Sequence, residues 1–432
     1  MSRRRRPWRS GLSGSDPYDF GVPLTRQQIY RRRRIVVFGA AGLVLAIVFY
    51  LPMTLLAPLR AVEPTVAQPA VASGAPAVLD LPGYGGTAIG AVGFDGVLAH
   101  SGSTSPLPMA SITKLITALV VLQAKPLAVG ADGPSVTMTA ADAALYHHYL
   151  AADGQVVTVK AGWVFTEHEL LQLALIHSAN NYAATLALWA FGSMDAYLAA
   201  TNTWLTAHQL TSITVTDPTG LDPTDVASTA DLIQLGKLTL ADPVLAPIVK
   251  TQSVTIHDVG TLTNTNTLLG SDGIEGIKTG TLNGAGSNLL FASRHQVGTA
   301  TVVVVGVVLG GSTHQALDAD IRSLLTGVLA GFHQVKLATK GDAFAKYTTE
   351  WGQKVSAVAK TSAALVTWGD AKITTSVTAT PVATGARGQQ VGTATFTSEG
   401  HTVTVPLGLS ARIDDPGPGW RLSHPGLIVG AP

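Results

Sequence analysis

The sequence predicts an α/β (α+β) fold in which one antiparallel sheet packs on helices, with a membrane helix before it and a small β-rich domain after it. Three observations predict this architecture. Apolar helical stretches in the middle of the chain are bounded on both sides by apolar, strand-like runs. After about residue 336 the chain consists of short Thr- and Val-rich runs separated by Gly and Pro. Near the N-terminus, residues 35–57 form 23 consecutive uncharged positions.

Composition excludes several classes of protein. Of the 432 residues, 46% are hydrophobic and only 13% are charged, which excludes a disordered chain. Residues 1–34 hold ten Arg and two Asp, so the other 398 residues carry 18 basic and 25 acidic side chains, a net charge of −7. We interpret the Arg clusters as a topology and lipid-headgroup signal and expect no nucleic-acid partner. The absence of Cys excludes disulfides and thiolate metal sites.

The uncharged run at 35–57 is long enough to cross a hydrocarbon core of about 30 Å. Four Arg at 31–34 precede it and only Arg60 follows closely, so the positive-inside rule predicts a cytoplasmic basic tail at 1–34 and an extracytoplasmic body, in a single-pass protein of the cell membrane. A cleaved signal peptide is the alternative, although the run exceeds an h-region of about 7–15 residues. We expect the Pro- and Ala-rich residues 58–84 to form an extended linker.

The body at residues 85–335 contains recognisable elements. A hairpin is expected around the turn dipeptide Asp95-Gly96. A break near Ser178 is expected to divide the helical stretch at 169–190. Helices are expected at 111–123, 169–190, 228–240 and 314–332, and two adjacent buried strands at 287–295 and 299–311. Residues 336–432 are expected to form the separate small β domain.

The first motif that carries chemistry is Ser111-Ile112-Thr113-Lys114, at the start of an apolar helix. The i,i+3 spacing places the Ser111 hydroxyl and the Lys114 amine on one helix face. Serine needs a neighbour to accept its proton, and a lysine that is shielded from water and flanked by other cations can be neutral enough to do so. Taken alone, the pattern also fits a helix that merely begins with a capping Ser.

Two further motifs follow the first. Ser178-Ala179-Asn180 offers a hydroxyl and an amide between two helical runs, and alone it would be interpreted as a helix cap. Lys278-Thr279-Gly280-Thr281 precedes the strand SNLLFAS. We expect Gly280, which has no side chain, to let a ligand lie close to the strand edge while Lys278 and Thr279 face the pocket.

The three motifs, in this order and separated by 67 and 100 residues, resemble the Ser-x-x-Lys, Ser-x-Asn and Lys-Thr-Gly triplet of penicillin-recognising serine enzymes. Their surroundings at 108–122, 169–187, 217–232 and 272–293 are similar to those of low-molecular-mass penicillin-binding proteins of the D-alanyl-D-alanine carboxypeptidase family. The resemblance covers about residues 85–333 and, more loosely, the β domain. It implies a β-lactamase/penicillin-binding transpeptidase-like fold for the body.

The resemblance also implies a function. A serine-type D-alanyl-D-alanine carboxypeptidase would remove the terminal D-Ala from peptidoglycan stem peptides through an acyl-enzyme on Ser111, with Lys114 as the base. Ser178 would pass a proton to the leaving amine, and Asn180 would orient the substrate amide. β-Lactam antibiotics are the expected inhibitors, and no metal or organic cofactor is expected.

The third motif would bind the substrate in this family. Lys278 would supply positive potential, Thr279 would bind the terminal carboxylate, and the N–H groups of Ser111 and Thr281 would form the oxyanion hole. Gly280 lies between these groups. The family also implies an Arg after the long strand to hold that carboxylate, but in GGSTHQALDAD only His314 can carry a positive charge.

Two other functions remain as alternatives. A class A β-lactamase shares the three motifs but deacylates with a Glu in an Ω-loop, and no Glu occurs between Asn180 and Glu275. A non-catalytic scaffold could use the same fold to hold cell-wall peptides, although the intact motifs favour an enzyme. The adjacent His147 and His148 are interpreted as structural, since neighbouring residues on a helix point apart.

Overall fold

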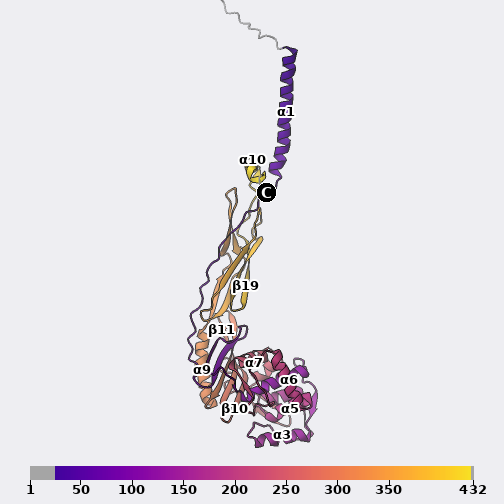
Figure 1. The fold of residues 1–432 in the computed structure, drawn as a ribbon, viewed down its shortest axis with the longest axis vertical. Coiled ribbons are helices and arrows are strands. Elements are labelled where there is room, and N and C mark those ends of the chain that lie inside the picture. The colour runs from indigo at the N-terminus through magenta and orange to yellow at the C-terminus, as the bar shows by residue number, and fades with distance from the viewer. Residues whose placement is uncertain (1–24, 430–432) are drawn as a thin grey trace, which may run out of the picture.

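The computed structural model describes residues 25–429, so most of the predicted basic tail, residues 1–24, lies outside the described residues. Figure 1 shows an elongated molecule with α1 (Arg26–Leu55) at one end, the β domain in the middle and the mixed helix and strand body at the other end. The predicted α/β (α+β) class is confirmed.

The central sheet of the body is antiparallel and joins segments from both ends of the domain. Its strand order is β10 (Ile274–Leu282), β11 (Gly286–Val297), β12 (Ala300–Gly311), β2 (Gly86–Ala91) and β3 (Ala99–Gly102). The hairpin around Asp95-Gly96 and the pair of buried strands form as predicted. Ile89 of the hairpin lies opposite Gly306 of β12, and this long-range pairing joins the hairpin to the three later strands in one sheet.

Helices cover both faces of this sheet. On one face, α9 (His314–Ala330) packs Leu317 and Ile321 into a cluster with Phe291 and Val304. On the other face, Val305 and Val307 join a cluster built mainly by the remaining helices of the body. Because both faces are buried, β12 reads as a continuous apolar run instead of an alternating one.

The remaining helices and short strands of the body position the loops of the site. Thr166 caps α4 with a capping box that includes Glu169, and Ser228 caps α7, as its position in the sequence predicts. The helices are α2 (Thr113–Ala124), α3 (Ala140–Ala151), α4 (Glu167–Leu175), α5 (Asn180–Phe191), α6 (Met194–Ala207), α7 (Thr229–Ala241) and α8 (Leu245–Lys250), with a 3₁₀ turn η1 (Ala110–Ile112) before α2. The short strand pairs are β4 (Leu107–Pro108) with β7 (Val226–Ala227), β5 (Ser135–Thr137) with β6 (Val164–Thr166), and β8 (Ser253–Ile256) with β9 (Gly260–Thr263).

The β domain forms as expected, but the expected boundary at residue 336 falls inside a strand. Its sheet has the order β1 (Thr65–Val66), β14 (Ala343–Thr348), β15 (Lys354–Ala359), β19 (His401–Leu409), β18 (Gln390–Ser398) and β17 (Thr374–Ala379). β13 (Phe332–Ala338) follows α9 and pairs with β16 (Ala363–Trp368). Phe332 contacts both Trp368 and Phe94 edge-on, with ring centroids 4.7 and 5.6 Å apart. This strand pair therefore joins the two domains through aromatic packing, which a change in composition cannot reveal.

The segment at 58–84, which we expected to form an extended linker, contacts the rest of the chain along its length. Val62 bridges to Val382, and Thr65 and Val66 pair with β14. Leu79 and Leu81 pack against the cluster under α9. The backbone of an extended segment offers unpaired N–H and C=O groups to an open sheet edge, so pairing along the β domain satisfies them. Residues 58–84 and the β domain therefore form one packed unit, which we call the stalk.

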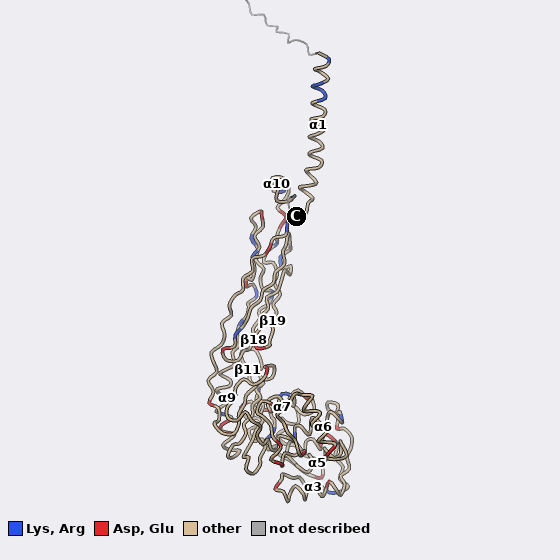
Figure 2. Tube along the Cα trace, in the orientation of Figure 1, with Lys and Arg blue, Asp and Glu red and all other residues tan. Residues whose placement is uncertain are grey.

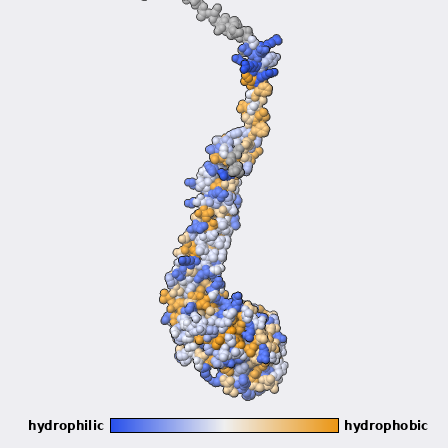
Figure 3. Space-filling model, in the orientation of Figure 1, coloured by the Kyte–Doolittle hydropathy of each residue, from blue (hydrophilic) through white to orange (hydrophobic). Residues whose placement is uncertain are grey.

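Helix α1 begins at Arg26, nine residues before the predicted apolar start, because Thr25 forms a capping box with Gln28. Its apolar side chains are exposed along most of its length, and Figure 2 shows its basic residues gathered near the N-terminal end. Figure 3 shows the apolar surface of this helix beyond that basic end. Within residues 25–429, one helix is long and apolar enough to cross a membrane.

The last two described helices contact the C-terminal end of α1. Two short helices, α10 (Gly417–Ser423) and α11 (Pro425–Val429), lie there. Arg421 is only 8% exposed, pairs with Asp415 at 2.6 Å, and donates to the carbonyl oxygen of Ala57 at 2.7 Å. The Tyr50 hydroxyl donates to the carbonyl oxygen of Leu422 at 2.7 Å. These contacts satisfy carbonyl groups at the helix end and join the stalk to α1.

Replacing Arg421 with Ala should loosen this joint. A hydrogen bond to a charged group contributes about 1.5–3 kcal/mol, so amide hydrogen exchange in residues 415–429 and at the C-terminal end of α1 should accelerate in the full chain in detergent micelles. Arg412→Ala is the matched control, because the Arg412–Asp414 pair is 73% and 57% exposed and should contribute little. Equal exchange in the two variants would show that Arg421 does not hold the joint.

Candidate active site

Ser111 lies in the 3₁₀ turn η1, directly before α2, and two glycines let neighbouring segments approach this turn. Ala110 has a φ of +51°, in the left-handed region that residues with a side chain rarely adopt. A Cβ on Gly220 would lie 1.9 Å from the Ala110 carbonyl oxygen, and one on Gly280 would lie 2.8 Å from the Met109 carbonyl oxygen. Gly280 therefore permits the close approach of the turn that carries Ser111, and its role in letting a ligand lie close to the strand edge stays a prediction.

Lys114 lies under Ser111 in the first turn of α2, as the i,i+3 spacing predicts. Its Nζ is 2.8 Å from the Ser111 Oγ and also donates to the Thr219 carbonyl oxygen at 2.8 Å. The side chain is only 1% exposed. Asp217 shapes the loop that presents this carbonyl, since its Oδ1 accepts from the Gly220 N–H at 2.9 Å. The predicted nucleophile and base therefore meet in a fixed geometry.

Two buried lysines set the electrostatics of the site. Burial lowers the pKa of Lys114 well below its ordinary value, and the neighbouring charge of Lys278 lowers it further, against the opposing effects of Asp217 and Asp225. Burial alone lowers the pKa of Lys278 to about 7, and its Nζ donates to the Thr279 carbonyl oxygen at 3.2 Å. Two cations cannot share this environment at low cost, so Lys114 is poised to be neutral and to accept a proton.

Asp225 is a buried carboxyl that the sequence analysis did not identify. It is fully buried, and its Oδ1 accepts from the Thr216 N–H at 2.6 Å and from the Thr216 hydroxyl at 2.8 Å. Burial and the nearby charge of Asp217 raise the pKa of Asp225 to about 7. Its protonation state therefore affects how readily Lys114 loses its proton.

Ser178 and Ala179 lie between α4 and α5, and Asn180 is the first residue of α5, so the predicted break near Ser178 is confirmed. Ser178 has a φ of +63°, which turns the chain sharply and presents its side chain to the cavity. The Asn180 N–H donates to the Gln155 carbonyl oxygen at 2.7 Å. Asn180 is 2% exposed, and its Oδ1 has no hydrogen-bond partner among the described residues. A buried acceptor without a donor is costly, which points to a donor supplied by a ligand.

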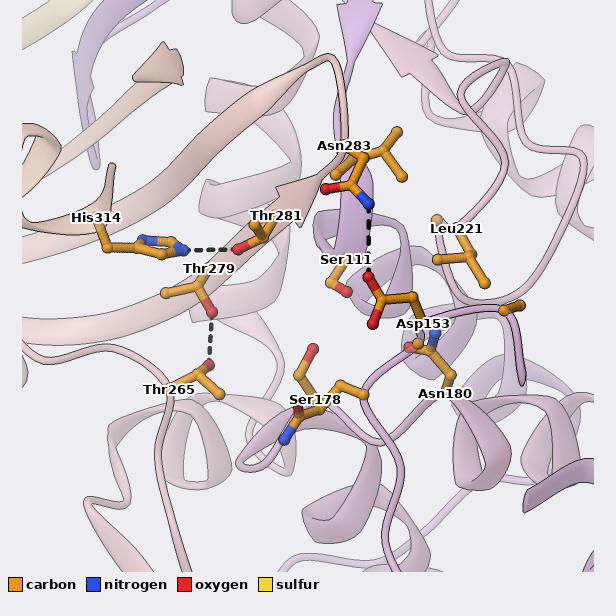
Figure 4. Close-up of a pocket in the computed structure, with 16 residues that line it drawn as sticks. Ser111, Asp153, Ser178, Asn180, Leu221, Thr265, Thr279, Thr281, Asn283 and His314 are labelled. Carbon is orange, nitrogen blue, oxygen red and sulfur yellow. Dashed lines mark hydrogen bonds between the residues drawn. The ribbon is translucent and has the colours of Figure 1, made fainter. Parts of the chain in front are cut away.

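The third motif lies on β10, at the edge of the central sheet, where its hydroxyl groups have partners from other elements. The hydroxyls of Thr279 and Thr265 are 2.5 Å apart, and the Thr281 Oγ1 is 2.7 Å from the Nε2 of His314 (Figure 4). His314 is the first residue of α9, directly after the long strand β12. His314 is the residue that can carry a positive charge in the segment where the family implies an Arg, and it contacts the third motif through Thr281. Burial lowers the pKa of His314.

These residues surround one cavity of about 670 Å³. Six of the eight predicted site residues line it, whereas Lys114 and Lys278 are buried outside its lining. Residues that the sequence analysis did not single out also line it: Ala152, Asp153, Gly154, Gln155, Gly220, Leu221, Thr265, Leu282 and Asn283. The turn dipeptides Asp153-Gly154 after a helix and Asn283-Gly284 between two strands are signals that could have located two of these loops. In residues 25–429, no group of three or more His, Cys, Asp or Glu side chains could hold a metal ion.

A serine in contact with a buried, easily deprotonated amine, in a cavity lined by hydroxyl and amide groups, defines a serine acyl-transfer site. The sequence model of the D-alanyl-D-alanine carboxypeptidase family matches residues 94–313, about half of the chain. The chain belongs to this family.

Individual relatives agree with this assignment. D-alanyl-D-alanine carboxypeptidase DacA of Escherichia coli is 27% identical over 260 residues, which are 59% of this chain and 63% of DacA. DacC of the same organism, also named as a D-alanyl-D-alanine carboxypeptidase, is 30% identical over 237 residues, 53% of this chain and 57% of DacC. The chain thus matches less than two thirds of the length of either relative.

A solved structure supports the fold. Penicillin binding protein 5 of Haemophilus influenzae covers 81% of this chain and all of its own, with a TM-score of 0.54 and 18% sequence identity. At this level of identity the likeness concerns the fold alone, and it confirms the predicted penicillin-binding-protein-like architecture of the body.

The electrostatics of the two lysines predict a bell-shaped pH profile for acylation of Ser111 by a fluorescent penicillin. Below the lowered pKa of Lys114 the base is protonated and the rate should fall; above about pH 7 Lys278 loses its charge and the rate should fall again. Lys278→Arg, which keeps its charge, should shift the alkaline limb upward. If the alkaline limb stays at the same pH in this variant, a group other than Lys278 causes the fall in rate.

Proposed function

We propose that the protein is a serine-type D-alanyl-D-alanine carboxypeptidase that removes the terminal D-Ala from peptidoglycan stem peptides. The observation that carries the proposal is the 2.8 Å contact between the Lys114 Nζ and the Ser111 Oγ beside a cavity lined by Ser178, Asn180 and Thr279. Membership of the family supports the reaction type. DacA and DacC, which are named as D-alanyl-D-alanine carboxypeptidases, support the substrate.

In the acylation step, neutral Lys114 accepts the proton of Ser111 while the Ser111 Oγ attacks the carbonyl carbon between the two D-alanines. The N–H groups of Ser111 and Thr281 stabilise the negative charge that develops on the carbonyl oxygen. Gly280 contributes by letting β10 approach the turn that holds Ser111. Ser178 passes a proton to the leaving amine, and free D-Ala departs. Water then hydrolyses the ester on Ser111.

Recognition of the terminal carboxylate falls to hydroxyl groups and a histidine. Figure 4 shows Thr279, Thr281 and His314 together on one side of Ser111. His314 holds the Thr281 hydroxyl at 2.7 Å, and Thr265 holds that of Thr279 at 2.5 Å, so both hydroxyls are oriented before a substrate binds. His314 thus acts as a hydrogen-bond partner where an Arg was expected, because burial lowers its pKa and disfavours its charged form, and buried Lys278 supplies the positive potential behind β10.

The two alternatives are less favoured. A class A β-lactamase needs a Glu that activates the deacylating water, and among the described residues that line the cavity the only acidic side chain is Asp153. A non-catalytic scaffold would have no need to bury Lys114 in contact with Ser111, where burial lowers the pKa of Lys114 and costs free energy. The geometry therefore favours catalysis.

The single-pass topology belongs to the same proposal. Helix α1 would cross the cell membrane with its basic N-terminal end in the cytoplasm and the catalytic body outside. Because residues 58–84 pack along the β domain, the stalk and not a loose tether would set the height of the cavity above the membrane. The substrates would then be cell-wall peptides at that height.

Incubation of the full chain with penicillin should give a covalent adduct on Ser111, and incubation with a peptide ending in D-Ala-D-Ala should release D-Ala. Lys114→Ala should slow both reactions by about 10²–10⁴-fold, because it removes the general base. Peptide mass spectrometry locates the adduct. An adduct on another residue, or undiminished acylation of a folded Lys114→Ala variant, would refute the assigned roles.

Thr279→Ala should separate carboxylate recognition from acylation. Loss of one hydrogen bond to a charged group corresponds to roughly a 10–100-fold decrease in carboxypeptidase kcat/KM. Acylation by an uncharged ester should fall much less, since this substrate has no carboxylate. Steady-state kinetics on both substrates make the comparison. Equal losses would mean that Thr279 acts on the fold or on the nucleophile.

A further inference from the structure

The turn that carries Ser178 has a backbone conformation that needs support from its surroundings. Ser178 has a φ of +63°, and α5, which begins two residues later at Asn180, has no side-chain cap. A residue with a side chain persists in this conformation only where neighbouring contacts hold it. Figure 4 shows the Ser178 hydroxyl directed toward Ser111. The contacts that hold the turn therefore determine where this hydroxyl lies.

His177, directly before Ser178, contacts a different segment with each ring nitrogen. Its Nδ1 lies 3.3 Å from the Thr263 carbonyl oxygen at the end of β9. Its Nε2 lies 2.8 Å from the Gln155 Nε2, in the loop after α3. A carbonyl oxygen only accepts and an amide NH2 only donates, so these partners together fit a neutral ring with its hydrogen on Nδ1. One imidazole thus joins the turn to two other segments.

The backbone on either side of His177 makes the same two connections. The Ile176 carbonyl oxygen accepts from the Thr265 N–H at 3.2 Å, and the Asn180 N–H donates to the Gln155 carbonyl oxygen at 2.7 Å. Both Thr265 and Gln155 line the cavity, whereas His177 does not. The ring therefore acts on the cavity only through the segments that it joins.

We propose that His177 is a positioning residue that holds the Ser178 hydroxyl where it can pass a proton to the leaving amine. The inference rests on the proposed function, in which the scissile C–N bond breaks as its nitrogen gains a proton from Ser178. The Ser178 hydroxyl then regains the proton that Lys114 accepted from Ser111. A misplacement of about 1 Å can cost a reaction about 10²-fold, so the ring affects the rate without touching the substrate.

The test compares two substrates with the full chain in detergent micelles. One is a peptide ending in D-Ala-D-Ala, and the other is its thioester analogue, in which sulfur replaces the scissile nitrogen. A thiol has a pKa of about 8.5, so a thiolate leaves without a proton, whereas an amine must gain one. His177→Ala should lower kcat/KM roughly 10–100-fold for the peptide and no more than about threefold for the thioester. A damaged fold would lower both values equally.

Two conservative variants separate the two contacts of the ring. His177→Asn keeps an amide N–H that can donate to the Thr263 carbonyl, and His177→Gln keeps an oxygen that can accept from Gln155. Each should recover part of the peptide activity that His177→Ala loses. His100→Ala is the matched control, because His100 is exposed on β3, at the opposite edge of the central sheet from β10, so the ratio of the two kcat/KM values should persist.

A double mutant tests whether the ring acts through the serine. In a Ser178→Ala background, His177→Ala should cause no further loss with the peptide, because residues that act as a unit are not additive. An unchanged ratio in His177→Ala, or a full second loss in the double mutant, would overturn the inference while leaving the carboxypeptidase intact.

A different result would overturn the proposed function. If the wild-type protein cleaves neither substrate while penicillin still acylates Ser111, the proposed substrate is wrong. The penicillin reaction then tests His177, because the lactam nitrogen must also gain a proton when its bond to the carbonyl carbon breaks. Undiminished acylation of His177→Ala by penicillin would overturn the inference, and slowed acylation would support it.

Discussion

The contact between Ser111 and a desolvated Lys114 is the constraint on which the rest of the site depends. A lysine amine can act as a base near neutral pH only if burial and a neighbouring cation disfavour its charged form. Here α2 buries Lys114, Lys278 on β10 adds a like charge, and the loop that Asp217 shapes offers the Thr219 carbonyl as a hydrogen-bond acceptor. The sheet, the loop and the helix must therefore meet at one point, and Gly220 and Gly280 permit that approach.

The same arrangement divides the cavity into two unlike sides. Hydroxyl groups and His314 occupy one side of Ser111, whereas Asp153 and Asn180 occupy the other. Outside the body, the stalk combines the β sheet, the packed segment at 58–84 and the joint around Arg421. The packed segment and the contacts around Arg421 thus fix the position of the cavity along the molecule.

The sequence predicted those features that depend on local pattern. Caps, periodicity and turn chemistry predict three features that the structure confirms. These are the cap of α7 at Ser228, the break near Ser178 and the spacing of Ser111 from Lys114. Features that depend on contacts between distant segments were not predictable in this way. The pairing of β2 with β12 and the packing of residues 58–84 on the β domain are of this kind. So are the partners His314 and Thr265, which the fold brings to β10 from 33 and 14 residues away.

Direct titration of the Lys114 amine tests the central claim. Lysine labelled with ¹³C at Cε and ¹⁵N at Nζ, in the full chain in micelles and assigned by comparison with Lys114→Ala, reports the protonation state by NMR. We predict a neutral amine at pH 7 and a higher pKa for Lys114 in Lys278→Met, since that substitution removes a like charge. A Lys114 ammonium at pH 7, unaffected by the loss of Lys278, would contradict it.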